Sequence, residues 1–551
     1  MPALTGRRAF LQLLLDEGVT HLFGNPGTTE LAIMEVVPDF PQLEFVLGLQ
    51  ESVVVAMADG FCRASGRLAA ANVHVMPGLG NAMGALYNAK FSGSPVILTA
   101  GQQEQGHGLL EPMLYEPLVP VAQPLVKWAV EVTRAADLPR IVHRAAKVAL
   151  TPPTGPVFLS LPGDVLDETA EMDLGRPVRV DAATRPNDAA LESISRLLLQ
   201  AKRPAILAGQ ELAMREAFAE AAELAELLGA AVYASSIPYT AQFPTDHPAY
   251  MGAFTRAQQQ VRAALEAHDL LLVLGADLLR MSVYSPVEPL PPGLPVIHVS
   301  ERAHELGKNY RTDVALEADV KQTLQALLPL LRQSTRREEA EKRLAQLKPK
   351  NWSAQRDRAR IEALHAAETK PIDPQYLMLR FTETLPRDAV VVDEGLVSSY
   401  PLPKLLPLSG PRDYYGLASG GLGFAVPGAV GISLALPGRP IAVVSGDGAA
   451  MYGIQGLWTA ARHGLPITYV IANNRGYRII KERLVSFRKT DRFTGMDIRE
   501  PDIDFVSLAG SLGLEARRVT DPQDIAPALR EAFASGKPNL IDMRVADGFG
   551  G

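Results

Sequence analysis

The chain has 551 residues, too many for one hydrophobic core, so several domains are expected. A formal net charge of −7 gives no general attraction to nucleic acids or to anionic membranes, and we expect neither as a partner. The single cysteine, Cys62, excludes an intramolecular disulfide and a metal cluster held by cysteines.

The sequence shows no sign of membrane insertion or export. No stretch of about 20 uninterrupted apolar residues occurs, which is the length that a membrane-spanning helix requires. The amino terminus lacks the charged, apolar and cleavage regions of a signal peptide. We therefore expect a cytoplasmic protein.

The first β-α-β unit begins at Gly66 and reads GRLAAANVHVMPGLGNAMGALYNAKFSGSPVILTAG. It contains a short apolar strand, a glycine-containing turn, a helix of small residues and a second strand. His74 falls at the end of the first strand. We assign residues 1–170 to an amino-terminal α/β domain.

The middle of the chain predicts a second domain of the same class. RPAILAG, AAVYAS, HDLLLVLGA and LPVIHVS read as strands that alternate with helical patterns, over residues 185–335. The stretch 336–370 is rich in charges of alternating sign, which is typical of a solvated helical connector.

A second β-α-β unit begins at Gly438 and reads GRPIAVVSGDGAAMYGIQGLWTAARHGLPITYVIAN. The spacing from arginine to proline is 95 − 67 = 28 residues in the first unit and 466 − 439 = 27 in the second. Two domains of similar plan therefore flank the middle one, and the last occupies residues 371–551. The predicted fold class is α/β, with three domains built on parallel sheets.

The second unit places oxygen atoms at the ends of two strands. Asp447 follows the strand PIAVVS, and Asn474 follows ITYVIA. A right-handed crossover makes these strands parallel, so both side chains emerge at the carboxyl edge of the sheet. A carboxylate, an amide oxygen and the backbone carbonyl of Gly476 suit Mg²⁺, or Ca²⁺, bound together with a phosphorylated ligand.

Two glycines strengthen this interpretation. Gly446 and Gly448 let the backbone and the following helix start approach a diphosphate closely. Gly-Asp-Gly alone is a common turn. Joined to an asparagine pair 474 − 447 = 27 residues later, it becomes a specific signature.

With this signature the chain resembles the thiamine diphosphate-dependent enzymes, and the resemblance covers essentially its whole length. Within that family it is most similar to the benzoylformate decarboxylases and related 2-oxo acid decarboxylases of the acetolactate synthase-like superfamily. The stretches that carry this likeness are FGNPGTTE (23–30), LQESVVVAMADG (49–60), NVHVMPGLGNAMGAL (72–86), PLVKW (124–128) and YYGLASGGLGFAVPGAVG (414–431). The resemblance implies pyrimidine-binding, central and diphosphate-binding domains in that order.

The resemblance implies roles around the cofactor. Glu51 would hydrogen-bond N1′ of the aminopyrimidine and so help to remove the proton from C2 of the thiazolium. Leu422 would hold the two cofactor rings bent, and the carbonyl of Gly420 would accept from the 4′-amino group. The implied cofactor-binding residues are Glu51, Gly420, Leu422, Gly446, Asp447, Gly448, Ala449, Asn474, Gly476 and Tyr477. Read without the family, Glu51 is a helix-capping or surface acid and Leu422 a core residue.

His74 and Thr28 lie where the relatives carry a catalytic histidine and a substrate-binding serine. The resemblance implies proton transfer by His74 and a hydrogen bond from Thr28 to a substrate oxygen. The neighbouring Asn25, Pro26 and Gly27 would line the substrate pocket. From the residues alone, His74 is equally a structural histidine and GNPG a plain turn.

The chain also departs from the decarboxylase pattern. The second histidine of the relatives is missing, and LGADLLRMSVYSPVE offers Ser282 in its place. The helix after the asparagines carries Ile479, Ile480 and Arg483 where the relatives have smaller and aromatic groups. These residues narrow the pocket and add positive charge, which favours a smaller or acidic 2-oxo acid, unless Arg483 faces solvent. His107 is either the acid that replaces the missing histidine or a histidine on a solvated loop.

The resemblance implies an enzyme that decarboxylates a 2-oxo acid without oxidation and releases an aldehyde and carbon dioxide. A carboligase of the acetolactate synthase type, which forms or cleaves 2-hydroxyketones, stays open as the alternative. The central stretch has no flavin fingerprint, so FAD is not expected. GLGNAMG at 78–84 imitates only part of a dinucleotide motif, which argues against a nicotinamide oxidoreductase, and Glu51 argues against a non-catalytic cofactor-binding protein. In this family the active site lies between subunits, which implies a homodimer or homotetramer.

Overall fold

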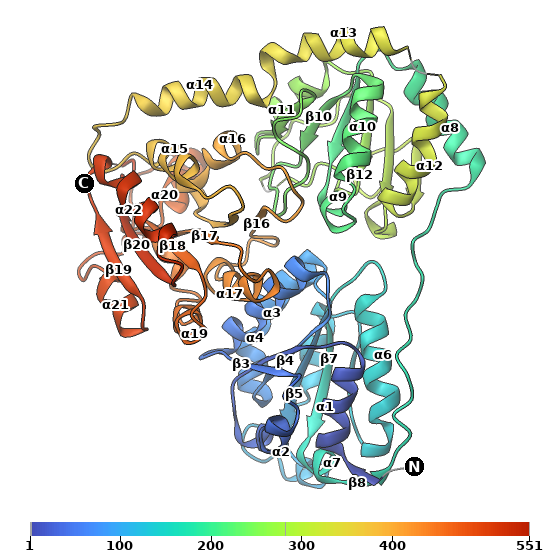
Figure 1. Cartoon of the computed structure of the whole chain (residues 1–551), viewed down its shortest axis with the longest axis vertical. Coiled ribbons are helices and arrows are strands. Elements are labelled where there is room, and N and C mark those ends of the chain that lie inside the picture. The colour runs from blue at the N-terminus through green and yellow to red at the C-terminus, as the bar shows by residue number, and fades with distance from the viewer. Residues whose placement is uncertain (1–2, 282, 335, 550–551) are drawn as a thin grey trace.

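The computed structural model describes residues 3–281, 283–334 and 336–549. Three six-stranded parallel β-sheets with flanking helices make up three α/β domains (Figure 1). In Figure 1 the amino-terminal domain is at the bottom, the central domain at the upper right and the carboxyl-terminal domain on the left. The predicted fold class is confirmed.

The amino-terminal sheet has the strand order β3-β2-β4-β5-β7-β6. Its middle strands are buried along their whole length because helices cover both faces of the sheet. The strands are β2 (His21–Gly24), β3 (Glu44–Leu47), β4 (Ala69–Val73), β5 (Val96–Gln102), β6 (Ala129–Glu131) and β7 (Val157–Pro162). The main helices are α1 (Gly6–Asp16), α3 (Glu51–Ser65), α4 (Val75–Ser92) and α6 (Leu138–Leu150). A short antiparallel pair, β1 (Ala3–Thr5) and β8 (Thr169–Glu171), lies beside it.

The carboxyl-terminal sheet repeats this topology, with the order β16-β15-β17-β18-β20-β19. When the strands of each six-stranded sheet are numbered from its own first strand, both sheets read 2-1-3-4-6-5. The strands are β15 (Val390–Glu394), β16 (Tyr414–Gly416), β17 (Ile441–Gly446), β18 (Ile467–Asn473), β19 (Glu515–Val519) and β20 (Asn539–Arg544). The internal repeat seen in the two β-α-β units therefore extends through both domains.

The central sheet has a different order, β11-β10-β9-β12-β13-β14. Its strands are β9 (Pro204–Ala208), β10 (Ala231–Ala234), β11 (Tyr250–Ala253), β12 (Leu270–Leu274), β13 (Val296–Ser300) and β14 (Val314–Glu317). Two charged helices, α13 (Arg337–Leu347) and α14 (Trp352–Leu364), run from this domain to the carboxyl-terminal one across the top of Figure 1. The boundaries at 170, 185, 335 and 370 stay a prediction.

Two helices join the terminal domains through backbone contact. The helix α3 packs on α17 (Ala425–Ala435) where glycines face the opposite helix. A Cβ at Gly60 would lie 2.1 Å from the carbonyl oxygen of Gly428, and one at Gly431 would lie 1.9 Å from that of Met57. Only glycine allows this approach, which explains the small residues in the GGLGFAVPGAVG stretch.

The segment between β17 and β18 is not one continuous helix. It forms α18 (Asp447–Ala450) and α19 (Gly456–Arg462), separated by a turn. A Cβ at Gly453 would lie 2.9 Å from Cδ of Pro427, so the turn follows the surface of α17. Among the residues described, no helix combines the length and apolarity that crossing a membrane requires.

Candidate active site

The strand order places the predicted site residues at two topological switch points. In an order of 2-1-3, the connections leave the first and third strands in opposite directions and open a crevice at their carboxyl ends. In the amino-terminal domain, residues 25–30 follow β2 and His74 follows β4. In the carboxyl-terminal domain, Gly395 follows β15 and Asp447 follows β17.

At the first switch point His74 is paired with a buried carboxylate. Nδ1 of His74 lies 2.7 Å from Oε2 of Glu30, whose side chain is fully buried. The other carboxylate oxygen accepts hydrogen bonds from the Thr29 hydroxyl at 2.8 Å and from the Gly101 amide at 3.0 Å. Burial raises the pKa of the Glu30 carboxyl, whereas these hydrogen bonds, those of Thr29 and His74 first, lower it.

The backbone on both sides of His74 is specialised. Val75 has a φ of 40°, which a β-branched residue rarely adopts, and it directly follows the histidine. A Cβ at Gly27 would lie 2.1 Å from Nδ1 of His74, so only glycine allows the imidazole to sit against this loop. Thr28, by contrast, is exposed, and the neighbouring Thr29 contacts the histidine at 3.2 Å.

Glu51 contacts α4, the helix that begins directly after His74. It is the first residue of α3, where the Gln50 side chain caps the helix by accepting from the Ser52 amide at 2.6 Å. The Asn81 side-chain amide donates to Oε2 of Glu51 at 3.0 Å. A Cβ at Gly78 would lie 3.2 Å from Oε1, so Glu51 contacts the first two turns of α4.

At the second switch point the backbone amide of Gly476 joins the predicted metal ligands. This amide donates to Oδ2 of Asp447 at 3.2 Å and to Oδ1 of Asn474 at 3.0 Å. Oδ1 of Asp447 accepts from the Gly448 amide at 2.8 Å. Both oxygen-bearing side chains are therefore at one point of the sheet edge.

The donor set fits a divalent cation. Burial raises the pKa of the Asp447 carboxyl to about 6, and the hydrogen bonds from backbone amides oppose this only in part. A buried carboxylate without a cationic partner gains from a metal ion, and an amide oxygen and a carbonyl complete a set of hard ligands. No group of three or more histidine, cysteine or acidic residues suited to a metal occurs in the described part of the chain, so a mixed set of this kind is the candidate.

Glycines leave space for an anion in front of this set. A Cβ at Gly446 would meet its nearest atom, the Gly395 carbonyl oxygen, only at 4.0 Å. A Cβ at Gly448, by contrast, would lie 2.9 Å from the ring of Tyr477, and the next residue, Ala449, is buried. The open side of Gly446 therefore leaves room for an anion.

The loop with Leu422 is held by a second buried acid. The Glu394 carboxylate, at the end of β15, accepts from the amides of Gly423 at 2.6 Å and Ala425 at 2.7 Å. Burial raises its pKa to about 7. Gly420, with a φ of 90°, leaves its backbone exposed on the other side of the leucine.

A cavity of about 270 Å³ separates this loop from the helices of the amino-terminal domain. Leu422 and its neighbours line one side, and Gln50, Ser52 and Asn81 line the other. Within the described residues of this one chain, no hydrogen bond or ion pair joins Glu51 or His74 to Asp447 or Asn474.

The chain matches one family of models along most of its length. They are described as the N-terminal thiamine pyrophosphate binding domain of thiamine pyrophosphate enzymes (residues 4–113), their central domain (191–327) and their C-terminal binding domain (399–543). A benzoylformate decarboxylase of Pseudomonas aeruginosa is 34% identical over 98% of both chains. The chain belongs to the thiamine pyrophosphate enzyme family.

Other members show how the chain is placed in this family. The solved structure of a thiamine diphosphate-dependent 4-hydroxybenzoylformate decarboxylase from Rhodococcus jostii has a TM-score of 0.88 and 33% identity, over 98% of this chain and 99% of that one. An acetolactate synthase of Mycobacterium bovis is 27% identical, over 98% of this chain and 88% of its own. Decarboxylases and carboligases are thus both among the relatives of this thiamine pyrophosphate enzyme.

The helix after the predicted metal ligands, α20 (Arg478–Arg488), is held from one side by a buried lysine. Nζ of Lys481 lies 2.7 Å from Asp497 and 3.5 Å from Asp547. The opposite face presents Ile480, which is 47% exposed, with Arg483 over the ring of Phe487 at 5.4 Å. Ile479 is half-buried between these faces, and Ser282 lies outside the described residues.

Three residues that contact the predicted site could not be singled out from the sequence. Glu30 reads as an ordinary first-turn acid, although it stands inside the quoted stretch FGNPGTTE. Asn81 appears only as an interruption of a dinucleotide motif, and Glu394 simply ends a strand. No local pattern could have found them, because their partners lie 44, 30 and 29 residues away, respectively.

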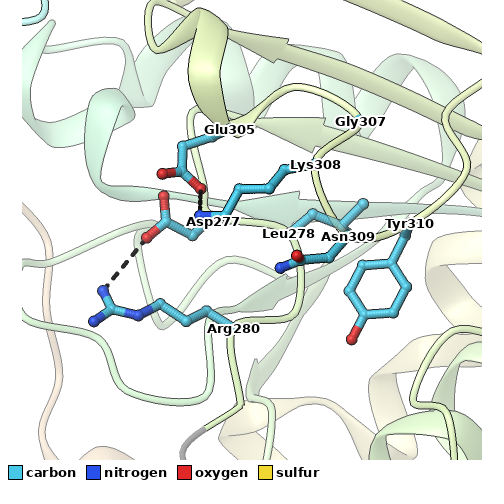
Figure 2. Close-up of a pocket in the computed structure, with 8 residues that line it drawn as sticks. All are labelled: Asp277, Leu278, Arg280, Glu305, Gly307, Lys308, Asn309 and Tyr310. Atoms are coloured by element: carbon cyan, nitrogen blue, oxygen red, sulfur yellow. Dashed lines mark hydrogen bonds and ion pairs between the residues drawn. The ribbon is translucent and has the colours of Figure 1, made fainter.

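A second hollow lies at the carboxyl edge of the central sheet (Figure 2). Its volume is about 20 Å³, and its cations are neutralised from within, Lys308 by Glu305 at 2.8 Å and Arg280 by Asp277 at 3.6 Å. Figure 2 shows both pairs converging on the same small space.

His107, the alternative proton donor, is exposed on its loop in the amino-terminal domain.

Proposed function

We propose that this enzyme decarboxylates a 2-oxo acid of the benzoylformate type and releases an aldehyde and carbon dioxide. The observation that carries the proposal is the placement of a carboxylate, Glu51, and a held imidazole, His74, at the first two turns of α4. The first suits cofactor activation and the second suits proton transfer. The likeness to two benzoylformate-type decarboxylases supports the choice of substrate class.

The cofactor would be held by the carboxyl-terminal switch point. Asp447, Asn474 and the Gly476 carbonyl are the proposed ligands of Mg²⁺, or Ca²⁺, with the diphosphate beside Gly446 and Gly448. Tyr477, Ala449, Gly420 and Leu422 would surround the rest of the molecule. When bound, thiamine diphosphate supplies the nucleophile and the electron sink that breaking a bond next to a carbonyl requires.

The chain's own residues would then direct protons and orientation. Glu51, fixed by Asn81, would hold a proton at the aminopyrimidine nitrogen. Nε2 of His74 would give and take a proton at the reacting carbon or its oxygen, since Nδ1 is committed to Glu30. The exposed Thr28 hydroxyl, with Asn25, Pro26 and Gly27 beside it, would orient the substrate carboxylate.

The outer face of α20 would select the substrate. Ile480, which is exposed, would narrow the substrate space, and Arg483, which lies over the ring of Phe487, would supply a positive charge. This combination favours a 2-oxo acid that is smaller than benzoylformate or that carries a second acidic group.

A carboligase of the acetolactate synthase type is the second candidate. It is favoured by Ser282, which stands where the decarboxylase pattern has a second histidine, because slower protonation leaves time for a second carbonyl compound to react. The acetolactate synthases among the relatives support it too.

Carbon-13 NMR of the enzyme with thiamine diphosphate, Mg²⁺, labelled 2-oxo acids and an added aldehyde separates these candidates. Labelled carbon dioxide with free aldehyde is the expected result. Carbon dioxide with a 2-hydroxyketone would identify the carboligase, and no turnover across a broad panel of acids would refute both. Sedimentation with and without cofactor tests the proposed homodimer or homotetramer, in which active sites lie between subunits.

A further inference from the structure

A carboxylate that no role in the proposed chemistry uses lies directly behind His74. Glu30 belongs to the short 3₁₀ turn at Thr28–Glu30, and its side chain has no exposed surface. Burying an ionised carboxylate is costly unless its oxygens are hydrogen-bonded. Here three donors converge on it, from Thr29, Gly101 and His74.

The geometry decides which nitrogen of His74 carries the proton. A carboxylate can only accept, so the 2.7 Å contact requires a hydrogen on Nδ1. The Thr29 hydroxyl gives its own proton to Glu30, so at 3.2 Å from Nδ1 it acts as a second acceptor. The neutral imidazole is thereby fixed with Nε2 as its unprotonated nitrogen.

We propose that Glu30 is a positioning residue for His74: it fixes the tautomer and ring orientation of the imidazole and stabilises its protonated form during proton transfer. This inference rests on the proposed function of His74. Glu30 would act as buried carboxylates do when they orient a catalytic imidazole through Nδ1.

Glu30 is the charged residue that contacts the imidazole of His74. Gly27 and Thr29 are its uncharged neighbours on the loop after β2. Glu51 lies against Gly78, one turn further along α4 than His74, and its carboxylate accepts from Asn81.

The chain provides a matched control pair. Nδ1 of His143 lies 2.5 Å from Oε1 of Glu17, and the Glu17 side chain is also fully buried. This pair ties α6 to the end of α1 and also involves Arg179. Glu17→Gln therefore removes the same charge from an equivalent pair that has no place in the proposed site.

The test combines histidine NMR with kinetics of the holoenzyme. The chain has 10 histidines, and nitrogen-15 labelling with His74→Gln as the assignment variant identifies the His74 signals. We expect wild-type His74 to be the Nδ1–H tautomer and Glu30→Gln to lose this preference, because the amide that replaces the carboxylate can also donate. Glu30→Gln should also lower kcat/KM by at least about tenfold and shift the acid limb of its pH profile. Glu30→Asp should restore part of the tautomer preference and of the activity, and Glu17→Gln should change neither the His74 signals nor turnover.

The outcomes distinguish this inference from the proposed function. An unchanged tautomer of His74 in a folded Glu30→Gln variant would overturn the positioning role. If the tautomer changes but His74→Gln turns over like the wild type, the proposed catalysis by His74 falls, and Glu30 loses its part in it. A Glu30→Gln, His74→Gln double variant that is no slower than His74→Gln alone supports the coupling.

Discussion

The side-chain amide of Asn81 donates a hydrogen bond to the carboxylate of Glu51 at 3.0 Å, and this contact joins two helices of the amino-terminal domain. Glu51 is the first residue of α3, and Asn81 stands two turns into α4. The direction of the carboxylate is therefore fixed by a residue outside its own helix. Any chemistry that depends on where Glu51 points also depends on Asn81.

We expect Asn81→Ala to lower kcat/KM by up to about 100-fold, because the carboxylate loses the donor that orients it. Exchange of the cofactor C2 proton, followed by NMR in deuterated water, should slow by a similar factor. Asn187→Ala is the control, because Asn187 also makes one amide contact as the cap of α8 (Asp188–Gln200), in the central domain. It should cost about 1 kcal/mol of stability and leave exchange unchanged. Equal exchange rates in both variants would contradict the orienting role.

The second prediction concerns pH and Asp447. Burial raises the pKa of its carboxyl from 3.8 to about 6, so between these values the folded metal-free chain binds the proton more tightly than the unfolded chain. The free energy of unfolding should therefore fall as the pH rises through this window, by roughly 3 kcal/mol. Asp447→Asn cannot ionise and should be more stable than the wild type above pH 6, with no advantage below the unfolded value.

Urea unfolding of the metal-free proteins at several pH values measures this difference. Adding Mg²⁺ and thiamine diphosphate should reverse the order at neutral pH, because only the wild type keeps its proposed carboxylate ligand. Asp524→Asn removes an exposed carboxylate and should give no comparable gain. A metal-free Asp447→Asn protein that is less stable than the wild type at neutral pH would show that the carboxylate is not strained by burial.

The sequence predicts those features that depend on local pattern and spacing. Apolar strand runs and the repeated β-α-β pattern suffice to predict three parallel-sheet domains. The positions of Asp447 and Asn474 after parallel strands suffice to predict that they lie at one edge of the sheet. It cannot predict features set by contacts between distant segments. The charged Lys481 is buried and the apolar Ile480 is exposed, because Asp497 and Asp547 come from later loops to bind the lysine.

The third prediction concerns substrate choice by Arg483. If this guanidinium meets the substrate, Arg483→Gln should reduce the preference for 2-oxo acids with a second carboxylate, measured as a ratio of kcat/KM values, by about tenfold or more. Uncharged aryl substrates should be affected little. Arg488→Gln, at the exposed end of the same helix, removes the same charge and should leave the ratio unchanged. Identical ratios in the two variants would place Arg483 in solvent.

The last prediction concerns Arg63, where the three domains meet. Its guanidinium lies 4.5 Å from the ring centre of Phe424, 5.5 Å from Tyr415 and 5.7 Å from Tyr239, and it donates to the Tyr239 carbonyl. Since each desolvated cation–π contact contributes up to about 2 kcal/mol, Arg63→Ala should lower the free energy of unfolding by about 2 to 4 kcal/mol. Calorimetry should show the unfolding transition splitting in two as the central domain is released. The control is Arg67→Ala, because Arg67 is exposed and lies over a single ring, that of Phe61. It should lower the free energy of unfolding by less than about 1 kcal/mol. Matching transitions in both variants would mean that the central domain is held in place without Arg63.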